Sequence, residues 1–331
     1  MSIELSNKIR VASLICTFMV IMRHARNLQA FWGTEQVNNI CGFVENGFSV
    51  LTEIAVPYFF LISGFFFFRT NFYQKGKYVE MLRKKWWTLM IPFLFWNIIW
   101  GIFLYAIGFM DWEESLTHKV LHLVRSDYYG ALWYVRNLML MMVLVPIYGW
   151  IFRLKNRWIY ACVSVFLLWW WWPVDCAWFS TEGWLFFFLG GMLQQNDSLL
   201  EKQMPRWMIV TLVVIWLTLC FAHPFWGLTM NKICTLLGIV VFWQLMVLLH
   251  GRPKEYLMPM IPMTFFIYVN HFWIVKGIKV LIAQYYPENG TIALAAYFVL
   301  PIITFFLLYY MGWLWKKVFP HSYEFCMGGR G

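Results

Sequence analysis

The stretch "ICTFMVIMRHARNLQAFW" (residues 15–32) decides the fold, because it is apolar enough for lipid and yet contains three basic residues. Arg23, His24 and Arg26 lie inside this run. Similar apolar runs recur along the chain, each about 18 residues or longer and so able to cross a bilayer. The first run therefore predicts a membrane-spanning helix that carries an ionisable cluster.

The composition also indicates a membrane protein. Hydrophobic residues make up 61% of the chain and charged residues only 13%, whereas a soluble globular chain has about 25% charged residues. We predict an all-α, polytopic membrane helix bundle of about ten transmembrane helices. The predicted spans are about 11–32, 46–68, 86–110, 131–152, 158–174, 183–195, 207–223, 230–249, 258–282 and 292–315.

The basic residues fix the expected orientation. Most of the 26 Lys and Arg residues lie in one set of loops and in the two termini. The positive-inside rule therefore places both termini in the cytoplasm. This distribution explains the net charge of +10 without a nucleic-acid partner.

Three segments outside the spans carry separate expectations. The outer loop 111–130 has the pattern of a short amphipathic helix, and the tail "HSYEFCMGGRG" (321–331) is expected to be loosely ordered. The seven cysteines show no CxxC or Cys/His spacing typical of a metal site, so no metal is expected.

Several ionisable residues fall at one predicted depth. An ionisable side chain within a span is costly and indicates a functional site by default. The predicted topology puts all of them in the outer halves of their spans, which predicts one polar cavity opening outward: Arg23, His24, Glu53, Arg136 and His271.

Structural roles remain open for the same residues. Arg23 and Glu53 could form an ion pair, and His24 could be satisfied by a neighbouring carbonyl. Arg26, Lys276 and Lys279 could extend to the outer headgroups, as long basic side chains do near span ends.

Two further stretches indicate a route for a ligand. "VPYFFLISGFFFFR" (56–69) contains Pro57, which kinks a helix, and then Ser63-Gly64, where a helix or a ligand can approach. "MLRKKWWTLMIPFLFWN" (81–97) places Arg83, Lys84 and Lys85 at the predicted cytoplasmic mouth. These cations either reflect topology alone or form a docking patch for an anionic cytosolic ligand, such as a nucleotide phosphate.

With these residues in place, the chain resembles the integral-membrane acyltransferases of family 3, which O-acylate cell-surface glycans. The first span has a basic residue and then a histidine, Arg10 and His24, although thirteen residues separate them where the family usually has ten. The other matching segments follow in the family's order: "VPYFFLISGFFF", "LRKKWWTLMIPFLFW", "GALWYVRNLML", "FFFLGGML" and "FFIYVNHFWIV".

The resemblance implies an enzyme, read as one transmembrane domain over residues 1–331 with no separate soluble domain. The donor would be a cytosolic acyl-coenzyme A, most often acetyl-coenzyme A, and the acceptor a hydroxyl of a surface polysaccharide or glycolipid. His24 would act as general base or transient acyl carrier, helped by Arg23, Glu53 and Arg136, with His271 as the rival base. The donor would be held by residues nearer the cytoplasm: Arg10, Ser63, Gly64, Arg69, Arg83, Lys84 and Lys85.

The same resemblance implies a bacterial cytoplasmic membrane, with the acceptor side facing outward. Two other classes stay open from the residues alone. A transporter or flippase for a glycolipid or anionic substrate would also suit ten spans with broken helices, and a membrane scaffold or sensor needs no catalysis. The aromatic faces would serve a homodimer or the surrounding lipid equally well.

Overall fold

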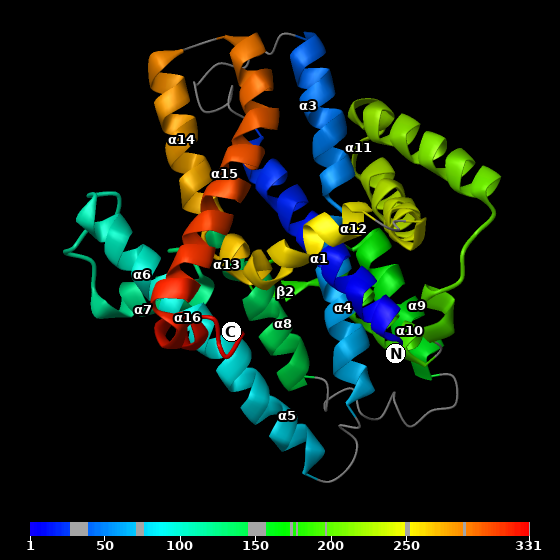
Figure 1. The fold of residues 1–331 in the computed structure, drawn as a ribbon, viewed down its shortest axis with the longest axis horizontal. Helices are drawn as coiled ribbons and strands as arrows, with labels where there is room; N and C mark the ends of the chain where they lie inside the picture. Colours follow the sequence, from blue (N-terminus) through cyan, green and yellow to red (C-terminus); the bar gives the residue numbers. More distant parts are fainter. Residues whose placement is uncertain are drawn as a thin grey trace. The chain divides into compact units, whose positions relative to one another are not determined.

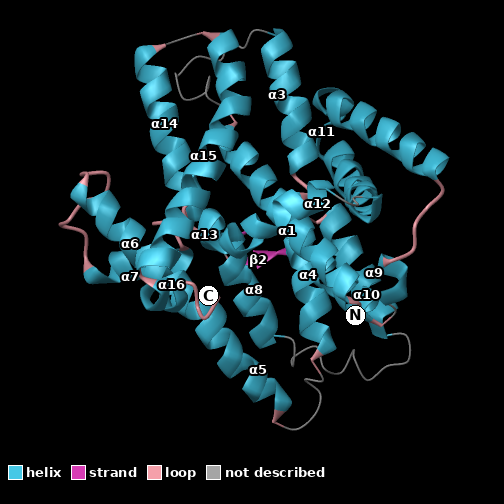
Figure 2. Ribbon diagram, in the orientation of Figure 1, coloured by secondary structure: helices cyan, strands magenta, loops and turns pink. Residues whose placement is uncertain are grey.

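The computed structural model describes residues 1–26, 39–70, 76–144, 157–172, 175–176, 178–195, 197–248, 252–286 and 289–330. Nearly all of these residues are helical, apart from one short two-stranded sheet (Figures 1 and 2). The α-helices are α1 (Ile3–Ala25), α3 (Asn39–Thr52), α4 (Ala55–Arg69), α5 (Lys77–Lys85), α6 (Ile91–Ala106), α7 (Leu116–Arg125), α8 (Trp133–Leu144), α9 (Arg157–Trp171), α10 (Thr181–Gln194), α11 (Arg206–Leu248), α12 (Arg252–Leu257), α13 (Thr264–Tyr268), α14 (His271–Tyr285), α15 (Gly290–Val318) and α16 (Pro320–Cys326). The shorter elements are the π-helical turn η1 (Trp86–Met90), the 3-10 turns η2 (Gly130–Leu132), η5 (Asp197–Leu200) and η6 (Met258–Met263), and the antiparallel strands β1 (Asp175–Cys176) and β2 (Phe179–Ser180).

The helices confirm an all-α, multi-pass membrane protein. Within the described residues, five helical stretches are long and apolar enough to cross a bilayer, and a sixth counts if one bent pair is a single span. Three shorter apolar helices of 10–17 residues lie at Gly130–Leu144, Ile159–Trp171 and Arg206–Ala222. The five long helices, the bent pair and the three shorter helices correspond in order to nine of the ten predicted spans. The remaining predicted span, 183–195, corresponds to α10.

Several predicted boundaries differ from the structure. α1 begins at Ile3, well before residue 11, and helix α5 extends the third span back to Lys77. The ends of the first and fourth predicted spans, 27–32 and 145–152, lie outside the described residues. Charged residues such as Glu4 and Glu80 begin these helices, and a hydropathy pattern alone does not reach them.

The chain divides into two compact units. Unit 1 comprises Met1–Phe59 and Asp197–Gly312, and unit 2 comprises Phe60–Asn196 and Trp313–Gly331.

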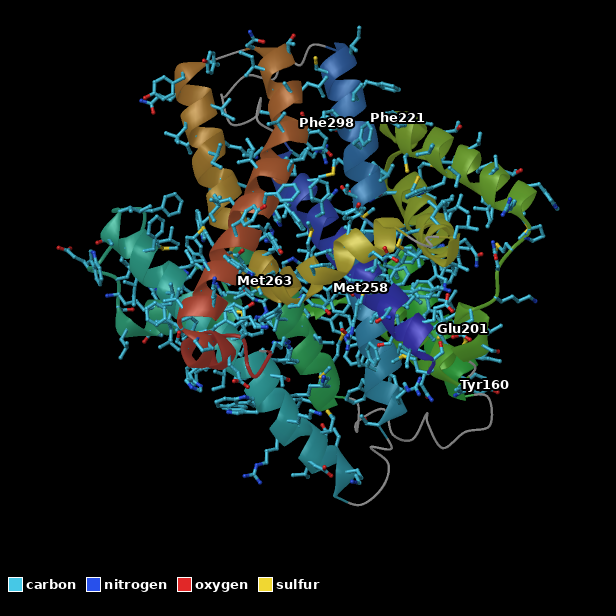
Figure 3. The ribbon with its side chains drawn as sticks, in the orientation of Figure 1. Tyr160, Glu201, Phe221, Met258, Met263 and Phe298 are labelled. Carbon is cyan, nitrogen blue, oxygen red and sulfur yellow. The ribbon has the colours of Figure 1, made fainter. Side chains whose placement is uncertain are left out.

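Aromatic contacts hold α3 within unit 1. The ring of Phe48 on α3 lies edge-on to Phe298 of α15, with centroids 5.0 Å apart, and to Phe221 of α11 at 5.8 Å. Phe298 and Phe221 lie on either side of α3 (Figure 3). Edge-to-face pairs of this kind favour a defined helix arrangement in a bundle where lipid offers no hydrophobic contrast.

Helices α3 and α4 together form a broken span. The helix is interrupted at Glu53–Ile54, four residues before Pro57. Proline has no amide hydrogen and its ring clashes with the carbonyl four residues earlier, which here belongs to Glu53. The helix is therefore interrupted at the place that Pro57 predicts, and Glu53 lies in this short turn, while Ile40–Arg69 as a whole still forms one apolar stretch long enough to span a membrane.

Helix α11 folds back on itself. Its backbone is helical over 43 residues, yet the indole Nε1 of Trp216 donates to the carbonyl of Cys234 at 3.0 Å. Eighteen residues of straight helix would separate these groups by about 27 Å. The chain therefore reverses between them, and α11 supplies the two adjacent spans that the sequence predicts.

The predicted continuous span 258–282 is wrong in one respect. The helix bends by 76° between the segment ending at Tyr268 and α14, which begins at His271. Asn270 stabilises the break, because its Nδ2 donates to the carbonyl of Phe266 at 2.9 Å. Such breaks at membrane depth occur where protein or a cavity satisfies the freed backbone groups.

Two glycines bring α4 and α10 into backbone contact within unit 2. A methyl group added to Gly64 would lie 1.9 Å from the carbonyl oxygen of Phe187, and one added to Gly190 would lie 1.9 Å from that of Leu61. No side chain fits at either place, so both positions require glycine. This is the close helix approach that small residues permit in membranes.

The loop 111–130 forms the predicted short helix. α7 begins after Ser115, whose hydroxyl accepts from the amide of His118 at 3.3 Å, and it ends at Ser126 in a left-handed conformation with φ of 57°. A serine N-cap of this kind satisfies one of the unpaired amides of the first turn.

The expectation of a loose C-terminal tail is wrong. Residues 320–326 form α16, and Tyr323, Cys326 and Met327 are buried in unit 2. The rings of Phe325 and Trp87 meet edge-on at 5.7 Å, and those of Tyr323 and Trp315 at 5.8 Å. These aromatic anchors fix a segment whose polar and glycine-rich composition reads as disordered.

Candidate active site

His24 lies at the last turn of α1, beside the start of α14. The centroid of its ring is 5.1 Å from that of His271 and 5.0 Å from that of Phe272. Two histidines more than 240 positions apart in the sequence thus meet within unit 1. The structure brings together two of the residues that the sequence singles out, one on each side of the contact between α1 and α14.

His271 is held by the helix break that precedes it. Its side chain is fully buried, and its Nδ1 lies 2.6 Å from the carbonyl oxygen of Tyr268. A carbonyl only accepts hydrogen bonds, so Nδ1 carries the hydrogen and Nε2 carries the lone pair in the neutral ring. The bend between α13 and α14 therefore sets both the position and the tautomer of this histidine.

Lys279, two turns further along α14, binds the C-terminal end of α1. Its Nζ donates to the carbonyl of His24 at 3.2 Å and also to the carbonyl of Arg26. Glu45 of α3 lies close enough to Lys279 to act on it electrostatically. A cation at the carboxyl end of a helix is favourable, since the last carbonyls there have no partner within the helix.

Two arginines flank His24 and pair with α3 and the break that follows it. Arg23 Nη1 forms an ion pair with Glu53 and contacts Ser49 Oγ at 3.2 Å. Arg26 Nη2 donates to Asn46 Oδ1 at 2.6 Å. The Arg23 side chain is 41% exposed and that of Glu53 16%, so the carboxylate is half-buried and the guanidinium is the more accessible partner.

Glu45, Asn46, Ser49 and Tyr297 belong to this cluster but do not stand out in the sequence as site residues. Glu45, Ser49 and Glu53 follow one another at intervals of four, which places them on one helix face. That spacing could have identified them, but the predicted span begins at residue 46 and leaves Glu45 in a loop. Tyr297 of α15 is buried near Glu45, Arg26 and Arg23, and nothing local in its sequence signals this.

Lys279→Met is expected to reduce turnover about tenfold while leaving the KM for the acyl donor unchanged. The substitution keeps the aliphatic stem but removes the donor to the His24 carbonyl, and a cation at a partly buried helix end contributes up to about 2 kcal/mol. Steady-state kinetics of purified protein would measure the effect. Lys276→Met is the matched control, because its ammonium lies over the Trp273 ring, 4.6 Å from the centroid. Equal turnover in both variants would contradict a positioning role for Lys279.

Arg10 is not brought to His24. Both residues are on the same straight helix, and fourteen positions correspond to about 21 Å. The Arg10 side chain is exposed, whereas the neighbouring Lys8 is buried and paired with Glu4 at 3.0 Å. A donor-binding role for Arg10 therefore stays a prediction.

In unit 2, Ser63 and Gly64 have different surroundings. Ser63 Oγ hydrogen-bonds the Tyr134 hydroxyl at 2.8 Å. The backbone of α10 occupies the space beside Gly64. The sequence allows either a helix or a ligand to approach this glycine, and the structure shows a helix there. A passage for the donor at Gly64 would require α10 to move.

The basic residues of unit 2 that the sequence singles out also differ in how far they are exposed to solvent. Arg69, Arg83 and Lys84 are exposed, and the Arg69 guanidinium lies 5.5 Å from the Phe65 ring centroid. Lys85 is half-buried and lies within electrostatic range of Arg330. Lys85 also lies within electrostatic range of Lys84, so it is the cation of α5 that links this run to the C-terminal tail.

Arg136 has a clear structural task. It is 5% exposed, and its Nη1 donates to the carbonyl of Arg125 and contacts Ser126 Oγ at 3.1 Å. It also stacks over Trp178 at 5.4 Å. These bonds cap the C-terminus of α7, and a role for Arg136 in charge stabilisation stays a prediction.

Over the described residues, no group of three or more His, Cys, Asp or Glu side chains has the arrangement of a metal site. The arrangement does offer an imidazole pair, a nearby carboxylate and several fixed cations. These groups suit proton transfer and the stabilisation of developing negative charge.

The comparison with known families agrees with this chemistry. The sequence matches the acyltransferase domain of the acyltransferase 3 family over residues 9–328, which is nearly the whole chain. No curated protein and no solved structure matches the chain. The match begins just before Arg10 and includes His24, His271, Arg23, Glu53 and Lys279. This chain belongs to the acyltransferase 3 family.

Proposed function

We propose that the protein is a membrane O-acyltransferase that moves an acyl group from cytosolic acyl-coenzyme A to a hydroxyl of a cell-surface glycan or glycolipid. Acetyl-coenzyme A is the proposed donor, and the proposed setting is a bacterial cytoplasmic membrane with the acceptor outside. Residues 1–331 would act as a single transmembrane domain. The observation that carries the proposal is the contact between His24 and His271, ring centroids 5.1 Å apart, in a chain of an acyltransferase family.

In the proposed reaction, His24 is the general base. It takes the proton from the acceptor hydroxyl as the oxygen attacks the thioester carbonyl, so the new C–O bond forms. The carbon–sulfur bond then breaks, and the coenzyme A thiolate receives that proton from the imidazolium. Histidine suits both steps, because its unperturbed pKa lies near neutral pH.

Neighbouring groups have supporting roles in this proposal. The partly exposed Arg23 would stabilise the oxyanion that develops on the thioester carbonyl. Glu53 would hold the Arg23 guanidinium in place, and Lys279 would fix the end of α1. His271 would position His24, and it is the rival base if His24 is dispensable.

The donor would bind in unit 2, where the basic residues of α5 lie. Charge-assisted hydrogen bonds from lysine and arginine to phosphate are strong, and Arg83, Lys84 and Lys85 provide three cations in the last turn of α5. Arg69 would add a fourth. Their placement at the cytoplasmic side follows from the positive-inside rule.

A transporter or flippase remains the second candidate, since two helices in the membrane are broken. The interruptions at Glu53–Ile54 and at Val269–Asn270 are of the kind that transporters use at substrate sites. A transporter would leave the thioester intact, so donor consumption separates the two functions.

The proposal is tested by thiol release from acetyl-coenzyme A in liposomes that contain purified protein and a native surface-glycan fraction. We expect wild type and His118→Ala to release free coenzyme A, and His24→Ala to do so at background rate. His118 is a matched control because it is an exposed histidine on α7. Thiol release that does not exceed protein-free liposomes would contradict the enzyme and favour the transporter.

A further inference from the structure

The C-terminal tail ends in a turn that only glycine allows. Gly328 and Gly329 both have positive φ, at 65° and 77°. A Cβ at Gly328 would lie 2.8 Å from the Trp87 carbonyl oxygen and 2.8 Å from Pro92 Cγ. The tail thus packs directly on the π-helical turn η1 and the start of α6, as Figure 1 also shows for α16.

This turn directs Arg330 into unit 2. Its Nη1 donates to the Met327 carbonyl at 2.9 Å, which closes the turn. The guanidinium lies within electrostatic range of both Lys85 and Tyr134. Tyr134 in turn shares a hydrogen bond with Ser63 at 2.8 Å, so Arg330 lies between a second cation on one side and a pair of hydroxyl groups on the other.

Burial lowers the pKa of the Arg330 guanidinium to about 10, and the nearby Tyr134 opposes that shift. The group is therefore still protonated at neutral pH. Two positive charges held close together in partly buried positions repel each other, which the fold has to offset. An anionic ligand between them would reverse this cost, because each cation could then donate to it.

We propose that the C-terminal tail is part of the donor site and that Arg330, together with Lys85, binds a phosphate group of coenzyme A. This inference rests on the proposed function, since it assumes that the donor is an acyl-coenzyme A. Arg330 lies two positions beyond residue 328, where the match to the family ends.

The site requires the tail to be placed before the donor arrives. Three contacts do this: the Phe325–Trp87 pair, the Tyr323–Trp315 pair, and a hydrogen bond of 2.9 Å from Trp315 Nε1 to Ser322 Oγ. A preorganised cation loses less freedom on binding than one on a mobile tail. Arg330 is thus set apart from the exposed Arg83 and Lys84.

The test is equilibrium binding of coenzyme A to the full chain in phosphatidylcholine nanodiscs, with 3′-dephospho-coenzyme A as the second ligand. We expect Arg330→Ala to raise the Kd for coenzyme A about tenfold and Arg330→Lys to restore part of it. If Arg330 and Lys85 hold the 3′-phosphate, Arg330→Ala will weaken binding of coenzyme A but not of 3′-dephospho-coenzyme A; if they hold the pyrophosphate, Arg330→Ala will weaken both ligands by the same factor. Either pattern supports the proposal. Lys317→Ala is the matched control, as it removes an exposed cation from the same end of the chain.

A second variant tests the turn. Gly328→Ala meets the Trp87 carbonyl, so it should displace Arg330 and weaken coenzyme A binding as Arg330→Ala does. Gly108→Ala is its control, because Gly108 also has positive φ, at 72°, but a Cβ there meets nothing within 4 Å. The monodispersity of each variant on gel filtration reports whether it is folded.

The possible failures are distinct. If wild type binds coenzyme A and folded Arg330→Ala binds it equally well, the tail proposal is overturned while the proposed function stands. If wild type binds no coenzyme A, both fall together. If Arg330→Ala instead loses retention of phosphatidylglycerol from mixed nanodiscs, with coenzyme A binding intact, the phosphate belongs to lipid and the donor-site proposal is overturned.

Discussion

Replacing His24 with alanine is expected to reduce acyl transfer by about a hundredfold to ten-thousandfold. That range is the usual contribution of one general base, and His24 is the histidine that α1 sets against His271, ring centroids 5.1 Å apart. The variant should still bind acyl-coenzyme A with unchanged affinity, because the proposed donor residues are elsewhere, in unit 2. Turnover and donor binding would be measured on the same preparation.

His271→Ala is the comparison that separates the two histidines. If His24 is the base, His271→Ala should reduce turnover less than His24→Ala and should not change which acceptors are used. Full activity in His24→Ala with complete loss in His271→Ala would reverse the assignment. Equal and complete loss of turnover in both alanine variants would indicate a proton relay that both histidines share. The solvent isotope effect on turnover of His271→Asn would then show whether His271 takes part in proton transfer.

Gly190→Ala is expected to destabilise the protein by about 3 kcal/mol, at the upper end of what overpacking usually costs. The added methyl group would lie 1.9 Å from the backbone oxygen of Leu61, and backbone cannot move aside as a flexible side chain can. Gly64→Ala should behave in the same way against Phe187. Thermal unfolding in detergent would measure the loss.

Gly277→Ala provides the matched control for these variants. Gly277 is also a helical glycine, but a Cβ there meets nothing within 4 Å. Alanine favours helix over glycine by up to about 1 kcal/mol, so this variant should be as stable as wild type or slightly more so. If Gly190→Ala and Gly277→Ala unfold at the same temperature, α4 and α10 do not meet at these glycines.

The sequence predicts those parts of the fold that depend on local pattern. Apolar runs locate the membrane helices, Pro57 predicts the interruption between α3 and α4, and Ser115 marks the start of α7. Each of these signals acts within a few residues, so it can be read without knowledge of the tertiary structure. The rarity of ionisable residues within the predicted spans also identifies His24 and His271 as candidates before their contact is known.

Other features depend on contacts between distant segments. The helix bends by 76° just before His271, but the two residues at the bend are valine and asparagine, and neither predicts a break as a proline would. The tail has a glycine-rich, polar pattern that predicts disorder, and only its aromatic contacts with Trp87 and Trp315 make it ordered. From the sequence alone, Lys279 is predicted to extend to the membrane surface. Its actual partners, the carbonyls of His24 and Arg26, are more than 250 positions away and cannot be identified from local sequence.

Transfer across a sealed membrane tests the central claim most directly. Proteoliposomes would hold radiolabelled acetyl-coenzyme A only inside and the surface glycan only outside. Vesicles would be selected in which the C-terminus of the protein faces the interior. We expect label on the outer glycan with wild type and none with His24→Ala. Label that appears only when donor and glycan share one compartment, or none at all while donor is bound, would contradict transfer from the cytosol to the cell surface.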